Sequence, residues 1–303
     1  MRFYTDHLEN HIFPELGTRP ISEISRKDCR TLIAKCREKG LRIGTVRGIL
    51  RTISTVLSQA VEDDLLPANP ALQMRKHLKR GDEPESQPDP FTRDEAAHLL
   101  AVTKEHYPKL YPLLLCGLRT GMRLGELLAL QWGDIDWQGR FIQVRRNLVR
   151  GNLTTPKNHQ QRRVDMSPLL RRVLRLSRRV QAIESLTNGT ERPDWVFPSA
   201  LGTALDDANV RKAFNAALDK AGLHRRGPHQ MRHTFGSLLV NAGEPITYVS
   251  RQMGHKDSSI TLRVYARWMV DPTGRKGVDS LDSEDRIAKS LQRPTSAPLR
   301  KIA

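Results

Sequence analysis

The sequence predicts a mainly α-helical protein with two domains: a small helical N-terminal domain, and a larger helical domain that contains a small antiparallel β-sheet. Its 303 residues exceed what one hydrophobic core usually holds, since domains typically contain about 100 to 200 residues. Capping motifs and apolar residues spaced three and four apart recur along the chain. Strand-like alternation is confined to residues 132–166 and does not alternate with helices as a parallel α/β fold requires.

Residues 1–78 have the pattern of a small helical bundle. Ser25 and Asp28 form a capping box at the start of one helix, and Thr45 is positioned to cap the next. The second helix has an apolar face formed by Val46, Ile49, Leu50, Ile53, Val56, Leu57, Ala60 and Val61. Its basic residues lie off that face. They could form an ordinary solvated surface or one that contacts DNA.

A proline-rich segment follows the first domain. Residues 79–90 contain three prolines and no large apolar side chain, as a flexible or extended linker does. We therefore expect a second domain at 91–273, followed by a polar C-terminal tail at 274–303.

Most of the second domain has helical signals. Thr92 begins a helix with a capping box, and Gly121 is a stop signal for the helix after it. Later helices are expected at 167–186, which is rich in arginine, and at 206–221. A short helix between these groups begins beside Arg123 and has an apolar face of Leu124, Leu127, Leu128 and Leu130.

The strand signals lie between these helices. Ile142 and Val144 alternate with polar residues, as in a half-buried strand. The segment 152–166 is predicted to form a hairpin with Lys157 near its turn.

The charge of the chain favours a polyanionic partner. Lys and Arg number 50 against 33 Asp and Glu, which gives a formal net charge of +17. Nucleic acid is the leading candidate, and the alternative is a solvated basic surface. Aromatic residues make up only 5% of the chain, so contacts to DNA phosphates are favoured over base stacking.

Cysteine usage and hydropathy favour the cytoplasm. The three cysteines, Cys29, Cys36 and Cys116, form no C-x-x-C pair and are expected to be reduced. The longest apolar run, Leu113–Leu118, is far shorter than the roughly 20 residues of a membrane span. Neither export nor membrane insertion is indicated.

Side chains that could attack a phosphodiester are concentrated in residues 227–268, with further candidates upstream. Cleavage through a covalent link needs a nucleophile, cations that stabilise the developing charge, and an acid for the leaving oxygen. The candidates are Tyr265, Arg123, Lys157, His229, Arg232 and His255.

Each candidate also has a structural interpretation. Tyr265 shares a helix face with Leu262 and Trp268, as a core aromatic would. Lys157 could simply face solvent. Arg123 is harder to explain in this way, because the helix dipole opposes a cation at a helix N-terminus. Its position therefore indicates a functional role.

Metal and carboxylate sites are weaker alternatives. His229 and His233 have the spacing of helical zinc ligands, but no Glu follows the first His, and Arg232 between them would repel a metal. Two carboxylate pairs are expected to be structural, one in a turn and one at a helix start: Asp134 with Asp136, and Asp206 with Asp207.

Five ordered blocks resemble the tyrosine recombinase (phage integrase) family. They are TGMRLGELLAL, TPKN followed by QRRVDMSP, HQMRHTF, MGHKDSS and TLRVYARW, and HIFPELGTRPISEIS resembles the family's core-binding domain. Met231 and Met253 stand where the family usually has Leu, a change that conserves volume. Compared with the family, the chain starts just before HIFPELG, so we expect a truncated N-terminus without an arm-site-binding domain.

The resemblance implies the DNA breaking-rejoining fold, with a core-binding domain and a catalytic domain, and a covalent mechanism. Tyr265 would attack the scissile phosphate to give a 3′-phosphotyrosyl link. Lys157 would protonate the leaving 5′ oxygen. The covalent link conserves the bond energy, so the resemblance implies neither ATP nor a metal cofactor.

The resemblance also implies how the phosphate is held. Arg123 and Arg232 would bind its non-bridging oxygens, and Glu126 would support them from behind. His229 and His255 would hydrogen-bond the phosphate or move the tyrosine proton.

The implied function is site-specific recombination by a phage or mobile-element integrase. Its partners would be double-stranded DNA and further copies of the chain, as a homotetramer on two DNA sites. Two alternatives stay open: a DNA relaxer similar to type IB topoisomerases, and a DNA-binding remnant that has lost catalysis.

Overall fold

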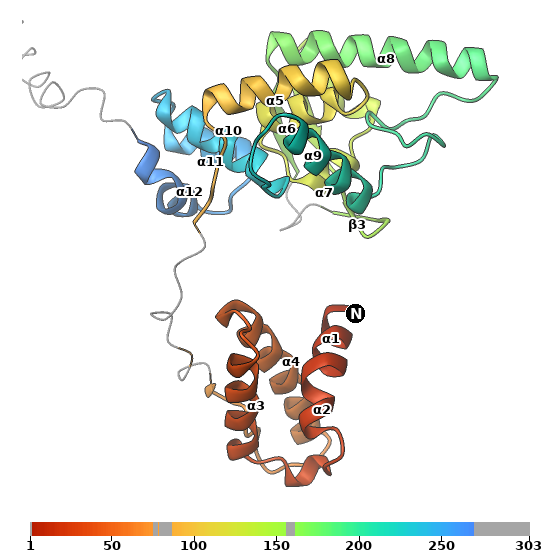
Figure 1. Ribbon diagram of the computed structural model, residues 1–303. Coiled ribbons are helices and arrows are strands. Elements are labelled where there is room, and N and C mark those ends of the chain that lie inside the picture. Colours follow the sequence, from red (N-terminus) through yellow and green to blue (C-terminus); the bar gives the residue numbers. More distant parts are fainter. Residues whose placement is uncertain (1, 75–77, 79–86, 156–160, 270–303) are drawn as a thin grey trace, which may run out of the picture. The chain divides into compact units, whose positions relative to one another are not determined.

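The computed structural model of the chain divides into two compact units, residues 1–87 and 88–303 (Figure 1). It describes residues 2–74, 78, 87–155 and 161–269. Most of these residues are helical, and every strand among them lies in the second unit, which confirms the predicted fold class. The predicted tail and most of the predicted linker lie outside the described residues.

The first unit is a small helical bundle. Its helices α3 and α4 pack against each other and against the N-terminal turns. The predicted capping box is present, because Ser25 Oγ accepts from the Asp28 N–H at 3.4 Å and the Asp28 carboxylate accepts from the Ser25 N–H at 2.9 Å. In chain order its elements are α1 (Arg2–His7), η1 (Leu8–Ile12), α2 (Phe13–Leu16), η2 (Ile21–Glu23), α3 (Arg26–Glu38) and α4 (Ile43–Glu62).

The predicted start of α4 was wrong. The helix begins at Ile43 after the N-cap residue Arg42, and Thr45 lies exposed within its first turn. The reason is tertiary: Ile43 is only 5% exposed, so packing extends the apolar face one turn before the capping signal. The face itself is as predicted except at Val56, which is 41% exposed.

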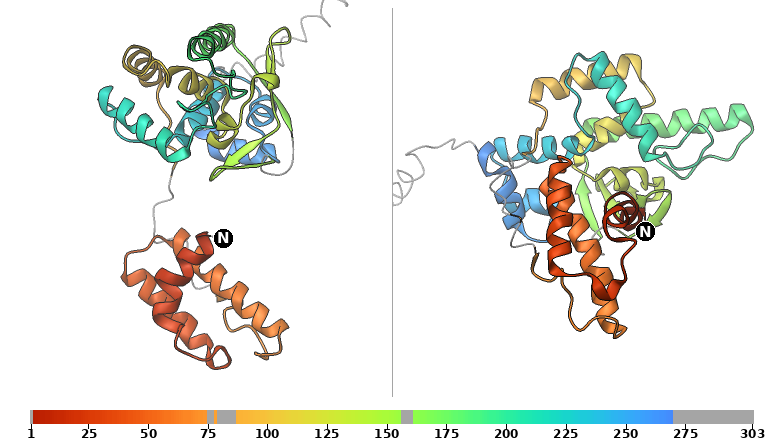
Figure 2. Two further views of the ribbon diagram at one scale, coloured as in Figure 1. Left: turned by 90° about the vertical axis from the view of Figure 1, so that its right-hand side faces the viewer. Right: turned by 60° about the horizontal axis from the view of Figure 1, so that its bottom comes forward.

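The second unit is a helical body with two small antiparallel sheets (Figure 2). Three helix starts were predicted correctly: the Thr92 capping box, and the side-chain caps of Ser167 and Asp206. Its elements are α5 (Arg93–His106), α6 (Tyr111–Thr120), α7 (Leu124–Leu128), η5 (Trp132–Asp134), β1 (Ile135–Asp136), β2 (Phe141–Val144), β3 (Asn147–Val149), β4 (Asn152–Thr154), β5 (Arg162–Asp165), α8 (Pro168–Asn188), α9 (Asp207–Lys220), α10 (His229–Asn241), α11 (Ile246–Met253), α12 (Ser258–Tyr265) and η6 (Ala266–Trp268).

The strands pair differently from the predicted hairpin. β4 pairs with β3 in a separate two-stranded sheet, whereas β5 pairs with β2 in the antiparallel order β1-β2-β5. Ile142 lies opposite Val164, and both are fully buried. The turn between β3 and β4 contains Arg150 and Gly151, each with positive φ. Burial of the apolar face of β2 therefore selects β5 as its partner over the nearer β4.

Two hydrophobic cores support the second unit. The larger lies between the sheet and helices α5 to α9, and the smaller packs α10, α11 and α12 around Tyr265.

The three cysteines are buried and unpaired, as predicted. Within the described ranges, no helix combines the length and apolar character that a membrane span needs.

Candidate active site

Arg123 lies at the sharp connection between α6 and α7. Gly121 ends α6 with φ +60°, and a Cβ there would lie 2.4 Å from the Phe235 ring, so glycine is required. Arg123 is the N-cap residue of α7. Its Nη1 donates to Glu126 Oε1 at 2.9 Å, and its backbone N–H donates to Glu126 Oε2 at 2.8 Å. The Glu126 carboxylate therefore compensates for a cation at a helix N-terminus.

Arg162, at the start of β5, holds the same carboxylate from the other side. Its Nη1 and Nη2 donate to the two Glu126 oxygens at 2.9 Å and 2.7 Å, and its Nε donates to the Gln252 carbonyl at 3.0 Å. The side chain is only 9% exposed. Arg162 thus joins the sheet to α7 and α11.

Sequence reasoning assigned no role to Arg162. A signal was present, because strand alternation places Arg162 on the same face as buried Val164. A charged residue at a buried strand position needs a partner.

Arg232 brings a third guanidinium to this point from α10. It is 3% exposed, its Nη1 donates to the Gly121 carbonyl at 2.7 Å, and its Nη2 is buried with no partner among the described residues. Burial, then the charges of Arg123 and Arg162, lower the pKa of Arg232 to about 9. Arg123 and Arg162 therefore share the Glu126 carboxylate, and Arg232 adds a third guanidinium whose Nη2, without a partner among the described residues, remains for an anion.

Glu126 is ionised at neutral pH. Burial would raise its pKa, but the hydrogen bonds and charge of Arg162, with those of Arg123, outweigh this effect and lower the pKa to about 2. Glu126 holds Arg123 and Arg162 together.

His255 lies beside the guanidinium groups. It follows Gly254, the left-handed residue that ends α11, and its Nδ1 is 2.7 Å from Thr261 Oγ1. Burial, then Arg232 and Arg123, lower its pKa to about 4. A neutral imidazole whose Nδ1 is occupied by the threonine leaves Nε2 for a ligand.

Tyr265 is fully buried and its hydroxyl has a histidine partner. The side chain is 0% exposed, and its hydroxyl oxygen is 2.9 Å from His233 Nδ1. Burial raises the pKa of Tyr265. Gly236 permits this position, because a Cβ there would be 2.6 Å from Tyr265 Cζ. Tyr265 therefore packs as a core aromatic and also has a polar partner at its reactive atom.

His233 was considered in the sequence only as a zinc ligand. In the structure its ring lies edge-on to His229, with 4.9 Å between ring centroids. Burial, then His229 and Arg232, lower the pKa of His233 to about 4, so its ring is neutral at pH 7 and has one unprotonated nitrogen. The available signal was its position one helical turn after His229.

Lys157 lies outside the described residues. The aspartate pairs are structural, as predicted. Asp134 caps η5 and forms an ion pair with Arg146 at 2.6 Å, and Asp136 accepts a hydrogen bond from the backbone N–H of a turn. Asp206 caps α9. Among the described residues, no group of three or more His, Cys, Asp or Glu could hold a metal ion.

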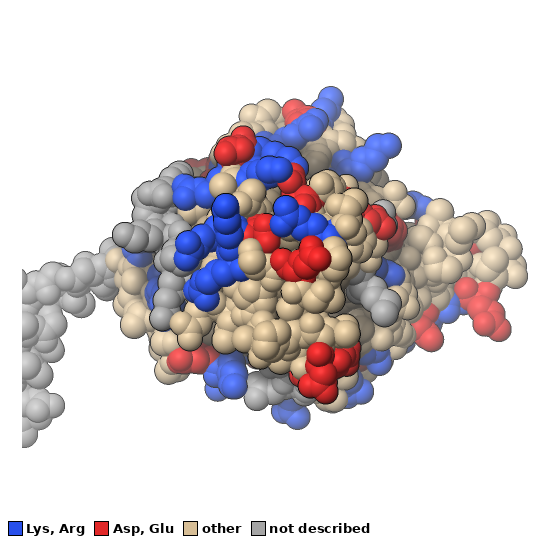
Figure 3. Space-filling view, turned by 90° about the horizontal axis from the view of Figure 1, so that it is seen from below, with Lys and Arg blue, Asp and Glu red and all other residues tan. Residues whose placement is uncertain are grey.

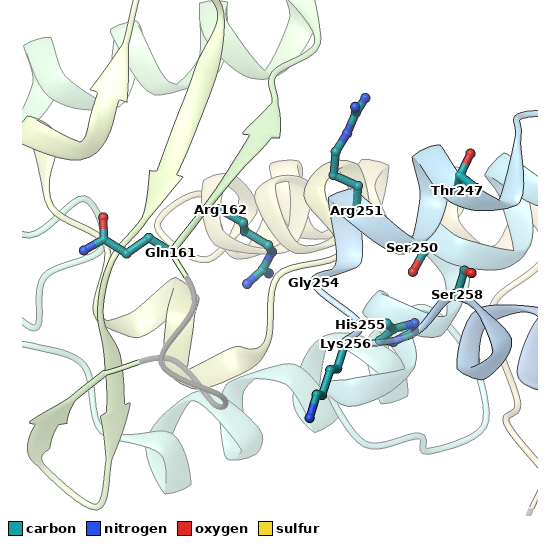
Figure 4. Close-up of a pocket in the computed structure, with 9 residues that line it drawn as sticks. All are labelled: Gln161, Arg162, Thr247, Ser250, Arg251, Gly254, His255, Lys256 and Ser258. Atoms are coloured by element: carbon teal, nitrogen blue, oxygen red, sulfur yellow. The ribbon is translucent and has the colours of Figure 1, made fainter.

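A pocket of about 390 Å³ opens beside these groups (Figure 4). Arg162 approaches it from β5, and His255 lies across from it in the loop after α11. The wall combines cationic and hydroxyl groups, as an anion site requires. It is formed by Gln161, Arg162, Thr247, Ser250, Arg251, Gly254, His255, Lys256 and Ser258.

Comparison with protein families gives two matches. The model described as "Phage integrase family" matches residues 90–270, and the model described as "Phage integrase central domain" matches residues 2–77. The two matches together cover both units of the chain.

Individual relatives are similar in sequence and fold. An integrase of Streptomyces ambofaciens is 30% identical over 301 residues, covering 90% of this chain and 72% of that protein. A "Tyrosine recombinase XerC-like" protein of Caldanaerobacter subterraneus subsp. tengcongensis is 27% identical, covering 86% of this chain and 72% of its own length. A structure of the Tn1549 transposon integrase in complex with transposon right end DNA has a TM-score of 0.73 at 22% identity, covering 95% of this chain and 93% of that one.

Proposed function

Because the chain belongs to the phage integrase family and is a tyrosine-type site-specific recombinase, we propose that it cleaves and rejoins DNA through Tyr265. The observation that carries the proposal is the buried Nη2 of Arg232, which has no partner among the described residues and lies near the guanidinium groups of Arg123 and Arg162 that share the Glu126 carboxylate. Such a site fits a phosphodiester, whose transition state concentrates negative charge on non-bridging oxygens.

The proposed roles follow from the contacts. Arg232 and Arg123 bind the non-bridging oxygens of the scissile phosphate, and His255 and His229 donate hydrogen bonds to the same group. Glu126 orients Arg123. These fixed donors stabilise charge in a partly buried site, where they act more strongly than in water.

The covalent step needs a deprotonated Tyr265. Its hydroxyl is 2.9 Å from the neutral Nδ1 of His233, which can take the proton as the phenolic oxygen attacks phosphorus. The bond to the 5′ oxygen breaks, and Lys157 supplies the proton to that leaving group. The lysine role is inferred from the TPKN block alone.

The proposed partners are double-stranded DNA and further copies of the chain. The net charge of +17 supports DNA binding, and Figure 3 shows basic side chains gathered in groups on one face, with acidic side chains between them. Solved relatives include a lambda integrase dimer bound to a core site and a tetramer bound to a Holliday junction. By analogy, we propose that residues 1–78 bind DNA and that the working form is a homotetramer on two DNA sites.

The test is covalent adduct formation on a nicked duplex made from the ends of the genetic element that encodes the chain. Tyr265→Phe should abolish adducts on denaturing gels while leaving DNA binding within about twofold, because one hydroxyl is lost and no charge changes. Reactions run in EDTA test the expectation that no metal is needed.

Tyr248→Phe is the matched control. Its hydroxyl donates to Asp165 at 2.8 Å and Tyr248 does not line the pocket beside His255, so this variant should keep forming adducts. An adduct that survives Tyr265→Phe would assign the nucleophile to another residue.

A further inference from the structure

Helix α8 has two apolar faces, which is unusual for a helix at the edge of a unit. One face packs inward through Leu170 and Leu174, both fully buried. Arg175 and Arg178 also turn towards the unit, where their guanidinium groups lie over the Trp137 ring at 5.6 Å and 6.0 Å. The C-terminal part of α8 extends beyond the neighbouring helices (Figure 1).

Beside the packed face runs a second apolar row, which we call the α8 seam. Its exposed members are Leu169 at 39%, Leu176 at 61%, Val180 at 45% and Ile183 at 63%. With partly buried Val173, these residues are spaced alternately four and three apart: Leu169, Val173, Leu176, Val180, Ile183. This spacing is the heptad repeat of a coiled coil, and it keeps one stripe facing a partner helix.

The residue types within the seam favour a pair of parallel helices. Val173 and Val180 occupy one seam position of the heptad, and Leu169, Leu176 and Ile183 occupy the other. A β-branched residue at the first position with mainly leucine at the second favours two parallel strands.

The charges that flank the seam favour the same arrangement. Arg179 lies on one side of the seam and Glu184 on the other, five residues later. In a parallel pair of identical helices, Arg179 of each copy faces Glu184 of the other. In an antiparallel pair in register, Arg179 would face Arg179. Among the described residues Glu184 forms an ion pair at 3.3 Å with Lys109, whose side chain is 88% exposed, and such a pair is worth little.

We propose that the α8 seam is a self-association surface, on which α8 of a second copy packs in parallel. The seam from Leu169 to Ile183 spans only about two heptads, so it gives weak association in free solution. It becomes effective where DNA already holds several chains together, because the effective concentration is then high. That last step rests on the proposed function, but the pairing itself can be tested without DNA.

Cysteine cross-linking tests the geometry directly. The native cysteines are buried, so an introduced thiol is the main accessible one. In a parallel pair identical seam positions face each other, so Val180→Cys should form a disulfide-linked dimer under mild oxidation. Val149→Cys is the matched control, because it is similarly exposed (48%) but lies on β3. Absent cross-linking at 180, or equal cross-linking at 149, would overturn the proposal and leave another segment or partner as the occupant of the seam.

Sedimentation of the DNA-free full chain tests the energetics. Leu176→Asp with Ile183→Asp should weaken dimerisation by about tenfold or more, because each buried Leu or Ile contributes at least that factor. Leu201→Asp, at a 90%-exposed position off the helix, should not weaken it. Glu184→Arg should weaken the dimer, and adding Arg179→Glu should restore it. Failure of this restoration refutes the parallel pairing.

Adduct formation on a single site separates the two proposals. The seam variants should retain it, because they alter no residue of the candidate active site. If the seam variants weaken dimers while adducts persist, self-association through α8 is supported whether or not the tetramer is correct.

Discussion

Replacing Arg162 with lysine tests whether DNA cleavage depends on a side chain that positions Arg123 through Glu126 and does not itself have to contact DNA. Arg162 makes three hydrogen bonds, two to Glu126 and one to the Gln252 carbonyl. Lysine keeps the charge but cannot form two parallel bonds to a carboxylate and also reach the carbonyl. We expect Arg162→Lys to lose about two of the three bonds.

The expected magnitudes follow from these contacts. Each bond lost is worth about 1 to 2 kcal/mol, so the free energy of unfolding should fall by about 2 to 4 kcal/mol. Glu126 would then hold Arg123 less firmly. Misplacing one transition-state donor costs about 10²- to 10³-fold in rate. DNA affinity should change much less, since the net charge is unchanged.

The assay is single-turnover cleavage, with DNA affinity and thermal unfolding measured on the same proteins. Arg163→Lys is the matched control, because the neighbouring side chain faces the other side of the strand, with its guanidinium over Phe141 at 4.7 Å. It should cleave DNA at close to the unmodified rate.

A double-mutant cycle decides the mechanism. If Arg162 acts by positioning Arg123, Arg162→Lys should slow cleavage little further in a chain that already carries Arg123→Ala, although stability still falls. Fully additive rate effects would refute this reasoning and indicate a direct contact between Arg162 and the phosphate.

Two further predictions concern Tyr265 and the histidines. Gly236→Ala should destabilise the α10–α12 packing by about 1 to 3 kcal/mol and reduce adduct yield, because its Cβ would lie 2.6 Å from Tyr265 Cζ; normal yield in a gel assay would contradict this. The pKa values of His233 and His255 are lowered to about 4 in the folded chain, whereas an unfolded histidine has a pKa of about 6.5. Between these two pH values the unfolded chain binds more protons than the folded chain, so the free energy of unfolding should fall as pH drops from about 6.5 to about 4. Thermal midpoints should show this slope and lose part of it in His255→Gln, and an unchanged slope would contradict the assignment.

Local signals predicted much of the fold correctly. The capping boxes at Ser25 and Thr92 are both present, because each depends on residues three apart in one turn. Thr45 shows the limit of such signals. Packing of Ile43 extended its helix by a turn, and a capping residue cannot report what lies across the core.

Strand pairing was less predictable than helix starts. The alternation around Ile142 correctly predicted a strand but did not identify its partner. Residues 152–166 were expected to pair with each other as a hairpin, whereas β4 pairs with β3 and β5 pairs with β2. That choice depends on which strand can bury Val164 against Ile142, a property of the assembled core.

The sequence by itself determined the chemical groups and their order along the chain, since nucleophile, guanidinium and imidazole types are read directly from residues. Only the tertiary structure decided which groups meet. Arg162 reaches Glu126 across 36 residues, and Tyr265 reaches His233 across 32. Contacts at that separation depend on how the sheet and three helices pack together, and neither residue spacing nor local propensity contains that information.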